Sequence, residues 1–473
     1  MSAEGPGDPV FTSEPILADT VGTPLLPDSV ETAPRERGRL PSLSGNSAAR
    51  LVADMTALGM ALVSATVTAR LLGPSGKGYY SSLLLLGGVF VVCFSAGLGE
   101  AVIVLAGRGK VTVRTAVAAT MGATLGLSVL GALVFVAAAY LTLGADTTND
   151  RVAILLGAVG TGLNVQYNTM AAFLLSQERV VAVAGLAIAA AAISTGALWV
   201  LVAGTGLGIA GALLGSVVGS AVVLVATITL LRRTGLSLRP RWVPAYLRSA
   251  FPFGASLQVS NLLVLMTARL DLVLVYRLAD ASTAGGYSVA LTIGTIVASV
   301  PTALAYASFP RLAALDDDEA RRLTADLFRV GVVAALLCGG AVALAVPTAI
   351  PVIFGQDYRG AIAPTLLLVP GGVLWSGQWI LCRAAAARGK PRPLLVSFVA
   401  SFVSMVALDL VLIPLWGAVG AGLASLVGSV VGLLVCGLYY RQWGWDWSAM
   451  VPRRGDVAAV FATVRRLVLA VRR

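Results

Sequence analysis

Long apolar runs follow one another between residues 51 and 440, and short polar breaks separate them. A bilayer-spanning helix needs about 20 apolar residues. Lipid offers no hydrogen bonds to the backbone, so only helices and closed barrels span it, and these runs are too long and continuous for barrel strands. The pattern predicts an all-α polytopic membrane protein. Its twelve transmembrane helices are predicted at residues 51–72, 79–106, 115–142, 152–175, 180–203, 207–231, 250–278, 285–308, 328–354, 361–387, 393–413 and 418–440.

Composition and charge agree with a membrane protein. Hydrophobic residues make up 57% of the chain, and charged residues make up 12%. Most Lys and Arg residues fall in alternate breaks, as the positive-inside rule describes, so both termini are predicted to be cytoplasmic. The net charge of +11 therefore mainly reflects basic residues that mark the cytoplasmic side of the membrane, and it does not indicate a nucleic-acid partner. The basic breaks lie at residues 108–114, 179, 232–248, 311–329 and 388–392, whereas Lys77, Arg151, Arg277 and Arg359 fall on the opposite, outer side.

The two ends of the chain differ from its apolar middle. Residues 1–45 are rich in Pro, Ser, Thr and Gly, which predicts a disordered cytoplasmic tail. No basic segment leads directly into an apolar core there, so this tail is not a signal peptide. Residues 441–473 are predicted to form an aromatic and basic cytoplasmic tail, whose apolar positions from Val457 to Leu467 have the spacing of a surface amphipathic helix.

The chain also contains an internal repeat. The segment 208–219 matches 417–428 at a constant offset, with Ser216 opposite Ser425. Residues 68–71 and 267–270 both read Thr-Ala-Arg-Leu, and Gly78-Tyr79 resembles Gly286-Tyr287. The repeat predicts two six-helix lobes, residues 46–231 and 250–440, joined by a cytoplasmic linker at 232–249. Because six is even, the lobes are expected to be related by a pseudo-twofold axis along the membrane normal, which suits alternating access.

Several short segments, in order, resemble one transporter family. The first outer turn reads Arg-Leu-Leu-Gly-Pro-Ser-Gly-Lys-Gly-Tyr-Tyr over residues 70–80. Later segments agree with it at residues 97–98, 269–271, 286–290, 309–312, 354–358, 388–391 and 412–421. Together they resemble the polysaccharide and O-antigen flippases of the multidrug, oligosaccharidyl-lipid and polysaccharide exporter superfamily.

This resemblance implies a flippase that moves a polyprenyl-pyrophosphate-linked oligosaccharide across the cytoplasmic membrane for cell-envelope or exopolysaccharide synthesis. The implied partners are the lipid-linked oligosaccharide, membrane lipids and polysaccharide-assembly enzymes, and no cofactor is implied. The sequence departs from the family at two positions. Ser95 stands where the family often has aspartate, and Asp409 stands where it often has asparagine, which puts ion coupling in question.

Charged and amide side chains inside the predicted helices are the candidate site residues, because intramembrane charges are costly and tend to be functional. Arginine can bind a pyrophosphate through two parallel hydrogen bonds. We expect Arg70 and Arg269 to face the space between the lobes, with Asp271 beside Arg269, although snorkelling of Arg70 to the headgroups and a structural ion pair of Arg269 are the alternatives. The candidate sugar-binding amides are Asn164, Gln166, Asn168, Gln258 and Asn261.

Ion coupling would require carboxylates, because the chain contains no histidine. The candidates are Asp54, Glu100 and Asp409, with Asp271 as a further one. No metal site and no enzyme constellation is apparent, and the glycine-rich stretch at 73–78 lacks the spacing of a phosphate-binding loop. A lipid II flippase and a multidrug cation antiporter of the same fold remain alternatives, as does a scaffold recruited through the N-terminal tail. A membrane glycosyltransferase is disfavoured because the predicted outer loops are short.

Overall fold

The computed structural model describes residues 45–107, 112–145, 147–177, 179–234, 238–445, 447–453 and 455–460. All of them belong to one compact unit, which spans residues 43–473. The predicted N-terminal tail, apart from Gly45, lies outside the described residues, as does the predicted surface helix beyond Val460.

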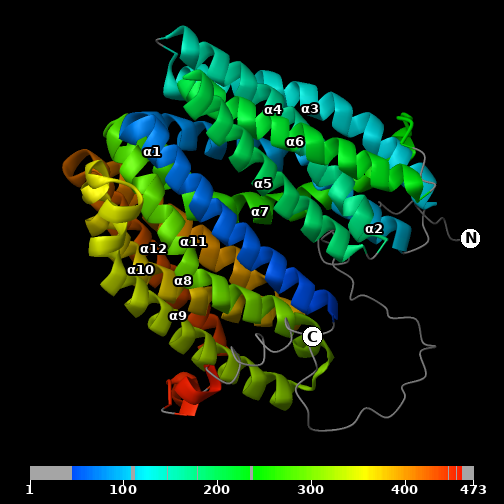
Figure 1. Cartoon of the computed structure of the whole chain (residues 1–473). Coiled ribbons are helices and arrows are strands. Elements are labelled where there is room, and N and C mark those ends of the chain that lie inside the picture. Colours follow the sequence, from blue (N-terminus) through cyan, green and yellow to red (C-terminus); the bar gives the residue numbers. More distant parts are fainter. Residues whose placement is uncertain are drawn as a thin grey trace, which may run out of the picture. The chain divides into compact units, whose positions relative to one another are not determined.

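Within these described ranges the structure contains helices and no β-strand (Figure 1). The α-helices are α1 (Gly45–Ser95), α2 (Leu98–Gly107), α3 (Val113–Leu143), α4 (Thr148–Leu175), α5 (Val180–Thr205), α6 (Gly208–Arg233), α7 (Pro244–Leu278), α8 (Ala281–Ala314), α9 (Asp317–Ile353), α10 (Ile362–Ala387), α11 (Arg392–Trp416) and α12 (Ala418–Gln442). Two short 3₁₀ helices are η1 (Gln356–Ala361) and η2 (Trp447–Met450). The prediction of an all-α membrane protein is confirmed.

The predicted apolar runs lie on these helices, but two boundaries differ from the prediction. Helix α1 carries two predicted spans, which meet at a bend where Gly73 has a φ of 68° and Pro74 follows. The prediction of one unbroken helix over 79–106 is wrong, because Ala96 and Gly97 have φ values of 49° and 61° and separate α1 from α2. We call residues 45–73 the first part of α1 and residues 74–95 its second part.

Ten described segments are long and apolar enough to cross a membrane, and α1 and α2 together count as one of them, Met55–Leu105. Helix α4 is not among the ten. The exact number of twelve spans in two lobes therefore stays a prediction.

The helices pack in two groups. In the first group, the second part of α1 packs with α3 to α6, and Leu83, Phe135 and Leu213 are fully buried between them. In the second group, α8 to α12 pack around α10, and α7 joins them through α11 and α8. The first part of α1 leaves its own group, because Ala65 and Ala69 pack against α8 and α9. The beginning of α7 in turn packs against the first group.

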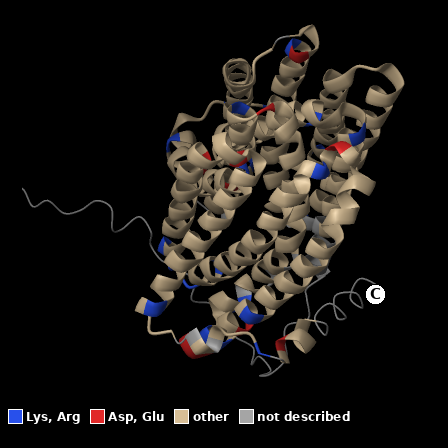
Figure 2. Ribbon diagram, turned by 90° about the vertical axis from the view of Figure 1, so that its left-hand side faces the viewer, with Lys and Arg blue, Asp and Glu red and all other residues tan. Residues whose placement is uncertain are grey.

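The helices of the second group alternate in direction, which gives the unit two distinct ends. The linker end carries the beginnings of α7, α9 and α11 and the ends of α8, α10 and α12. The glycine end carries the bend of α1 and the turn between α7 and α8. Charged residues gather mainly toward these two ends and leave the middle of the helices largely uncharged (Figure 2).

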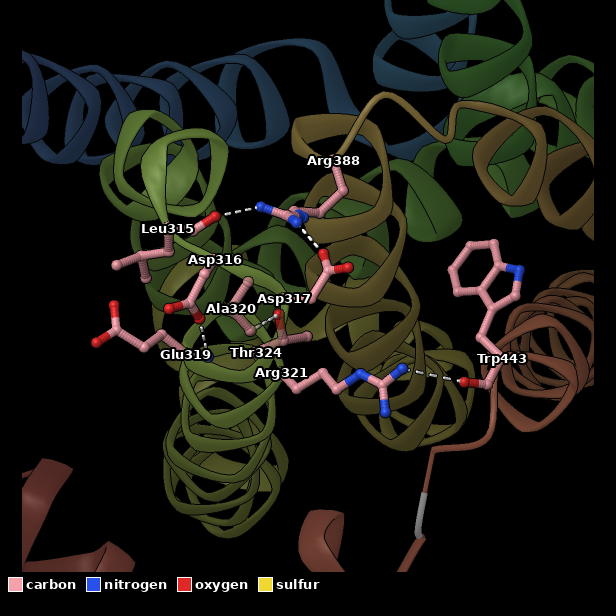
Figure 3. Close-up of polar contacts among 9 residues, drawn as sticks. All are labelled: Leu315, Asp316, Asp317, Glu319, Ala320, Arg321, Thr324, Arg388 and Trp443. Atoms are coloured by element: carbon pink, nitrogen blue, oxygen red, sulfur yellow. Dashed lines mark hydrogen bonds and ion pairs between the residues drawn. The ribbon is translucent and has the colours of Figure 1, made fainter.

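At the linker end, a polar network fastens three segments of the second group together (Figure 3). Arg388, which follows α10, donates to the carbonyl oxygen of Leu315 at 2.5 Å and forms an ion pair with Asp317 at the start of α9. Arg321 of α9 donates to the carbonyl oxygen of Trp443 at 3.4 Å, just after α12. Asp316 caps α9 by accepting from the Glu319 amide at 2.8 Å. These contacts fix the ends of α9, α10 and α12 relative to one another.

The described start of the predicted surface helix contacts the protein. Asp456 is buried and forms an ion pair with Arg329 of α9 at 3.3 Å. Val460 is also buried, and it packs against Val333 and Ala334 of the same helix. This segment is therefore docked on α9 by one ion pair and one apolar contact.

At the glycine end, backbones of the two groups meet without intervening side chains. A Cβ atom on Gly78 would overlap the carbonyl oxygen of Ala281, and one on Gly285 would overlap the carbonyl oxygen of Pro74. The two contacts are reciprocal, so Gly78 and Gly285 occupy equivalent positions in the repeat. The predicted register, Gly78 opposite Gly286, is therefore wrong by one residue, and Tyr80 corresponds to Tyr287.

We expect Gly285→Ala to destabilise the protein by about 1–3 kcal/mol, because the added methyl group collides with backbone that cannot rotate away. Gly286→Ala is the matched control, since its Cβ would meet only ordinary neighbours, the nearest being Ala361 Cβ at 3.8 Å. The thermal unfolding midpoint of the purified protein in detergent measures both effects. Equal midpoints for the two variants would contradict the close backbone contact.

Candidate functional site

The second helix group encloses a cavity of about 380 Å³. Helices α7, α8, α10, α11 and α12 line it together with Met55 and Leu58 from the first part of α1. Its wall carries an aromatic ring, Trp375, and one charged group among the described lining residues, Asp271. The other polar lining residues are hydroxyl-bearing: Thr267, Thr295, Ser299, Thr302, Ser401, Ser425 and Ser429. The cavity thus combines hydroxyl groups and a single carboxyl group with apolar walls.

Asp271 is held by three donors from three helices. The Tyr287 hydroxyl of α8 donates to its Oδ2, and the Ser425 hydroxyl of α12 donates to the same oxygen at 2.9 Å. The Leu272 amide donates to Oδ1 at 2.8 Å. Asp271 is 1% exposed and Tyr287 is fully buried. The carboxyl group therefore joins α7, α8 and α12 at the cavity wall.

Asp409 of α11 is the second buried carboxyl group in this region. Its side chain is 0% exposed, and neither of its oxygens has a hydrogen-bond partner among the described residues. It lies close enough to Asp271 for the charges of the two groups to interact. A buried polar group without a partner costs free energy, and a buried charge costs far more. The pair is therefore suited to hold a proton or a small cation.

The first helix group has a smaller cavity of about 270 Å³, lined by the second part of α1, α4 and α6. There the Tyr80 hydroxyl lies 3.2 Å from Ser216 Oγ, which corresponds to the contact between Tyr287 and Ser425. The Asn164 amide donates to Ser220 Oγ at 3.1 Å. No carboxyl group is present among the described residues of this wall. The two groups thus share a tyrosine–serine contact and differ in charge.

The candidate amides bond mainly to other protein groups. Gln166 is buried and donates to Ser128 Oγ at 2.9 Å, whereas Asn168 is exposed and donates to the Asn164 carbonyl oxygen. Gln258 of α7 donates to Ser95 Oγ at 2.8 Å and accepts from Asn261 at 3.0 Å. The last set joins the two helix groups beside Ser95, one of the two positions at which the sequence departs from the family pattern. Their role in sugar binding stays a prediction.

The two predicted arginines lie in different surroundings. Arg70 donates to the carbonyl oxygens of Ile353 at 2.8 Å and Val352 at 2.5 Å, so it caps the end of α9 across the groups. Arg269 is half-buried, and helical spacing places it on the face of α7 that carries Leu272, which packs against the second part of α1. Asp271 lies within electrostatic reach of Arg269. Neither arginine lines the cavity of the second group.

The remaining predicted carboxylates are not gathered at this site. Glu100 is exposed in the first turn of α2, and it does not line the cavity that contains Asp271. The side chain of Asp54 lies outside the described residues. Of the candidates for ion coupling, Asp409 is the one that the structure brings next to Asp271.

Sequence reasoning missed two basic residues within the helices, the buried Lys77 and the half-buried Arg383. Lys77 was assigned to an outer loop, but it is only 5% exposed, and its Nζ donates to Thr68 Oγ1 at 2.6 Å. Arg383 lies inside α10, where its guanidinium contacts the rings of Tyr306 and Trp379. The sequence could have indicated Arg383 as a candidate site residue, because this charged residue lies four residues inside a predicted transmembrane helix. No such indication exists for Lys77, because the burial of Lys77 depends on how the bend of α1 packs.

Comparison with known proteins agrees with this architecture. A family model described as polysaccharide biosynthesis protein matches residues 67–363, and no curated protein matches the sequence. The chain is similar to an inward-facing multidrug resistance MATE transporter of the MOP superfamily, with a TM-score of 0.68, 14% identity, and coverage of 84% of this chain and 98% of that chain. It is also similar to the lipid II flippase MurJ in an inward closed conformation, with a TM-score of 0.67, 12% identity, and coverage of 89% and 90%. An outward-facing MATE transporter gives a TM-score of 0.58 at 12% identity and coverage of 84% and 94%. These similarities show the fold.

We expect Tyr287→Phe to lower the thermal stability of the purified protein more than Tyr80→Phe does. Tyr287 donates to a carboxyl group, whereas Tyr80 contacts only a hydroxyl group, and hydrogen bonds to charged groups are roughly twice as strong as neutral ones. The two variants are matched, because both remove one hydroxyl group at equivalent positions. A larger loss for Tyr80→Phe would contradict the special role of the Asp271 contact.

Proposed function

Because the chain belongs to the polysaccharide biosynthesis protein family, we propose that it moves a polyprenyl-pyrophosphate-linked oligosaccharide across the cytoplasmic membrane by alternating access. The observation that carries the proposal is the family match over residues 67–363 on a multi-pass helical fold. We propose that the linker end faces the cytoplasm, since Arg232, Arg241, Arg321 and Arg388 all lie there. Assembly enzymes that supply or receive the sugar would meet the protein at the membrane.

The contacts between the two helix groups support a transport cycle. In the present state the glycine end is closed by the backbone contact at Gly78 and Gly285, and by the cap that Arg70 places on α9. Passage of a sugar head to the outer side would require these contacts to separate. The same change would bring the groups together toward the linker end, around the fixed site near mid-membrane. We therefore propose that Arg70 stabilises the closed glycine end, in addition to or in place of a contact with substrate.

We propose that Asp271 and Asp409 couple this movement to an ion gradient. Asp409 has no hydrogen-bond partner among the described residues, whereas Asp271 already accepts three hydrogen bonds. The two members of the pair therefore differ in how readily each gives up a proton or a cation. The sequence has no other described pair of buried carboxyl groups in electrostatic contact. Binding of a proton or cation here would neutralise charge between α7 and α11 and favour one arrangement of these helices.

One observation favours a second candidate, export of cationic drugs by the same fold. The cavity of the second group is lined by an acid and an aromatic ring, and by no arginine among its described residues, which suits a cation better than a pyrophosphate. The two functions differ in a measurable way. Cells that lack a drug exporter become drug-sensitive and keep their surface polysaccharide, whereas cells that lack the flippase lose the polysaccharide.

We expect cells without the protein to accumulate lipid-linked oligosaccharide on the cytoplasmic leaflet. Arg269→Ala should reproduce this block while the protein still inserts normally, because a guanidinium that binds pyrophosphate cannot be replaced by a methyl group. Arg277→Ala, at the exposed end of the same helix, is the matched control and should export normally. Leaflet-selective labelling of the sugar measures the distribution. Unchanged export in Arg269→Ala would remove Arg269 from substrate binding.

We expect Asp409→Asn to reduce export at least about tenfold while the protein folds and inserts, because an amide is similar in size but cannot exchange a proton or neutralise a cation. The dependence of export on external pH and on sodium should also disappear in this variant. Glu100→Gln, which changes an exposed carboxyl group, is the control. If Asp409→Asn keeps the pH and sodium dependence of the wild type, Asp409 is not the coupling group.

A further inference from the structure

Arg383 is enclosed by aromatic rings at the end of α10 that approaches the linker end. Its guanidinium carbon lies 4.5 Å from the ring centroid of Trp379 and 4.7 Å from that of Tyr306 on α8. Its Nη2 atom also donates to the Tyr306 hydroxyl at 3.0 Å. Trp379 stacks in turn on Trp375, with ring centroids 5.2 Å apart and an interplanar angle of 12°. We call these four residues the arginine–aromatic cluster.

The cluster adjoins the cavity of the second group. Trp375 forms part of the cavity wall, and so do Thr302 and Ala303, which precede Tyr306 by about one turn of α8. Tyr306 itself is 43% exposed. Because Arg383 follows Trp375 on α10 and Tyr306 follows Thr302 on α8, the cluster extends the cavity toward the linker end.

Two donor atoms of the cluster, one on Arg383 and one on Trp379, lack an acceptor among the described residues. Both Arg383 Nε and Trp379 Nε1 are buried without a hydrogen-bond partner among the described residues, and Trp379 is only 5% exposed. No acidic side chain of the described chain forms an ion pair with Arg383. An arginine without an ion-pair partner within a membrane span is costly, so such residues usually have a functional partner. A ligand for this cluster must bring negative charge and acceptor oxygens.

We propose that the arginine–aromatic cluster binds the head of the lipid-linked substrate, with Arg383 and Trp379 donating to a pyrophosphate and Trp375 packing against the adjoining sugar. This inference rests on the proposed function and names a substrate-binding site for it. A guanidinium presents parallel N–H groups that match phosphate oxygens. The face of an indole ring offers a large apolar surface to the C–H groups of a sugar, and its N–H group remains available for a hydrogen bond.

The cluster also explains how one cavity can serve an anionic head although Asp271 is the only charged residue among its described lining residues. The arginine lies near the linker end and the carboxyl group lies farther along α7, toward the glycine end. A head group that enters from the linker end would meet the arginine first. The carboxyl pair would then remain available for a proton or cation.

The test measures binding of inorganic pyrophosphate to the full-length protein in detergent by calorimetry and by tryptophan fluorescence. We expect saturable binding that quenches fluorescence, and we expect Arg383→Gln to weaken it about tenfold or more, as loss of a charge-assisted pair implies. Arg392→Gln, which removes an exposed charge near the same end of the protein, should bind as the wild type does. Equal binding by wild type and Arg383→Gln would overturn the proposal, and so would equal affinity for sulfate and pyrophosphate.

Two further variants keep the test decisive if Arg383→Gln does not fold. Arg383→Lys keeps the charge and loses the guanidinium fork, so it should fold and still bind pyrophosphate more weakly than the wild type. Trp375→Phe should abolish most of the fluorescence response, whereas Trp416→Phe, an exposed residue at the other end of the unit, should not. Wild-type binding and quenching in both Arg383→Lys and Trp375→Phe would overturn the site.

Failure of this site and failure of the proposed function give different results. If leaflet labelling shows sugar export but Arg383→Gln leaves pyrophosphate binding and export unchanged, the flippase function stands and the site is wrong. If pyrophosphate binds through Arg383 but loss of the protein leaves the leaflet distribution unchanged, the site stands and the flippase function is wrong.

Discussion

The structure depends on one constraint, that polar groups inside a bilayer must find their partners within the protein. Helix ends show how closely it is met. Tyr79 donates to the Gly144 carbonyl oxygen after α3, Tyr358 donates to the Ala69 carbonyl oxygen, and Arg70 supplies two hydrogen bonds to the last carbonyls of α9. Asp409, Trp379 and Arg383 are among the described residues that bury a polar atom without a hydrogen-bond partner. A proton, a cation or a substrate head group would satisfy these atoms.

The two helix groups have a shared framework and different chemistry. Each places a tyrosine of one helix against a serine of another, Tyr80 with Ser216 and Tyr287 with Ser425. Only the second group adds a carboxyl group to this contact, because Asp271 accepts from both Tyr287 and Ser425. The two groups therefore share the tyrosine–serine contact, and the described carboxyl group that we propose for ion coupling lies in the second group.

The sequence was sufficient to predict the helical membrane fold, the family and nearly every helix, because apolar runs of spanning length and short ordered motifs are local signals. It was not sufficient for features that depend on how helices pack. The burial of Lys77 follows from the bend of α1, and the nearness of Asp271 to Asp409 follows from the packing of α7 against α11. The break at Ala96 and Gly97 was missed because both residues also fit an apolar run. The register of the repeat was off by one because two glycines stand side by side at 285 and 286.

The reciprocal contact of Gly78 with Ala281 and of Gly285 with Pro74 has a consequence for the origin of the chain. It is an isologous interface, in which one surface meets a copy of itself, as in a twofold-symmetric dimer. A six-helix ancestor could form the same contact as a homodimer, and there each substitution would alter the interface twice. Fusion of two such copies into one polypeptide would end that coupling. The two halves could then diverge everywhere except where the backbone of one still excludes a side chain from the other.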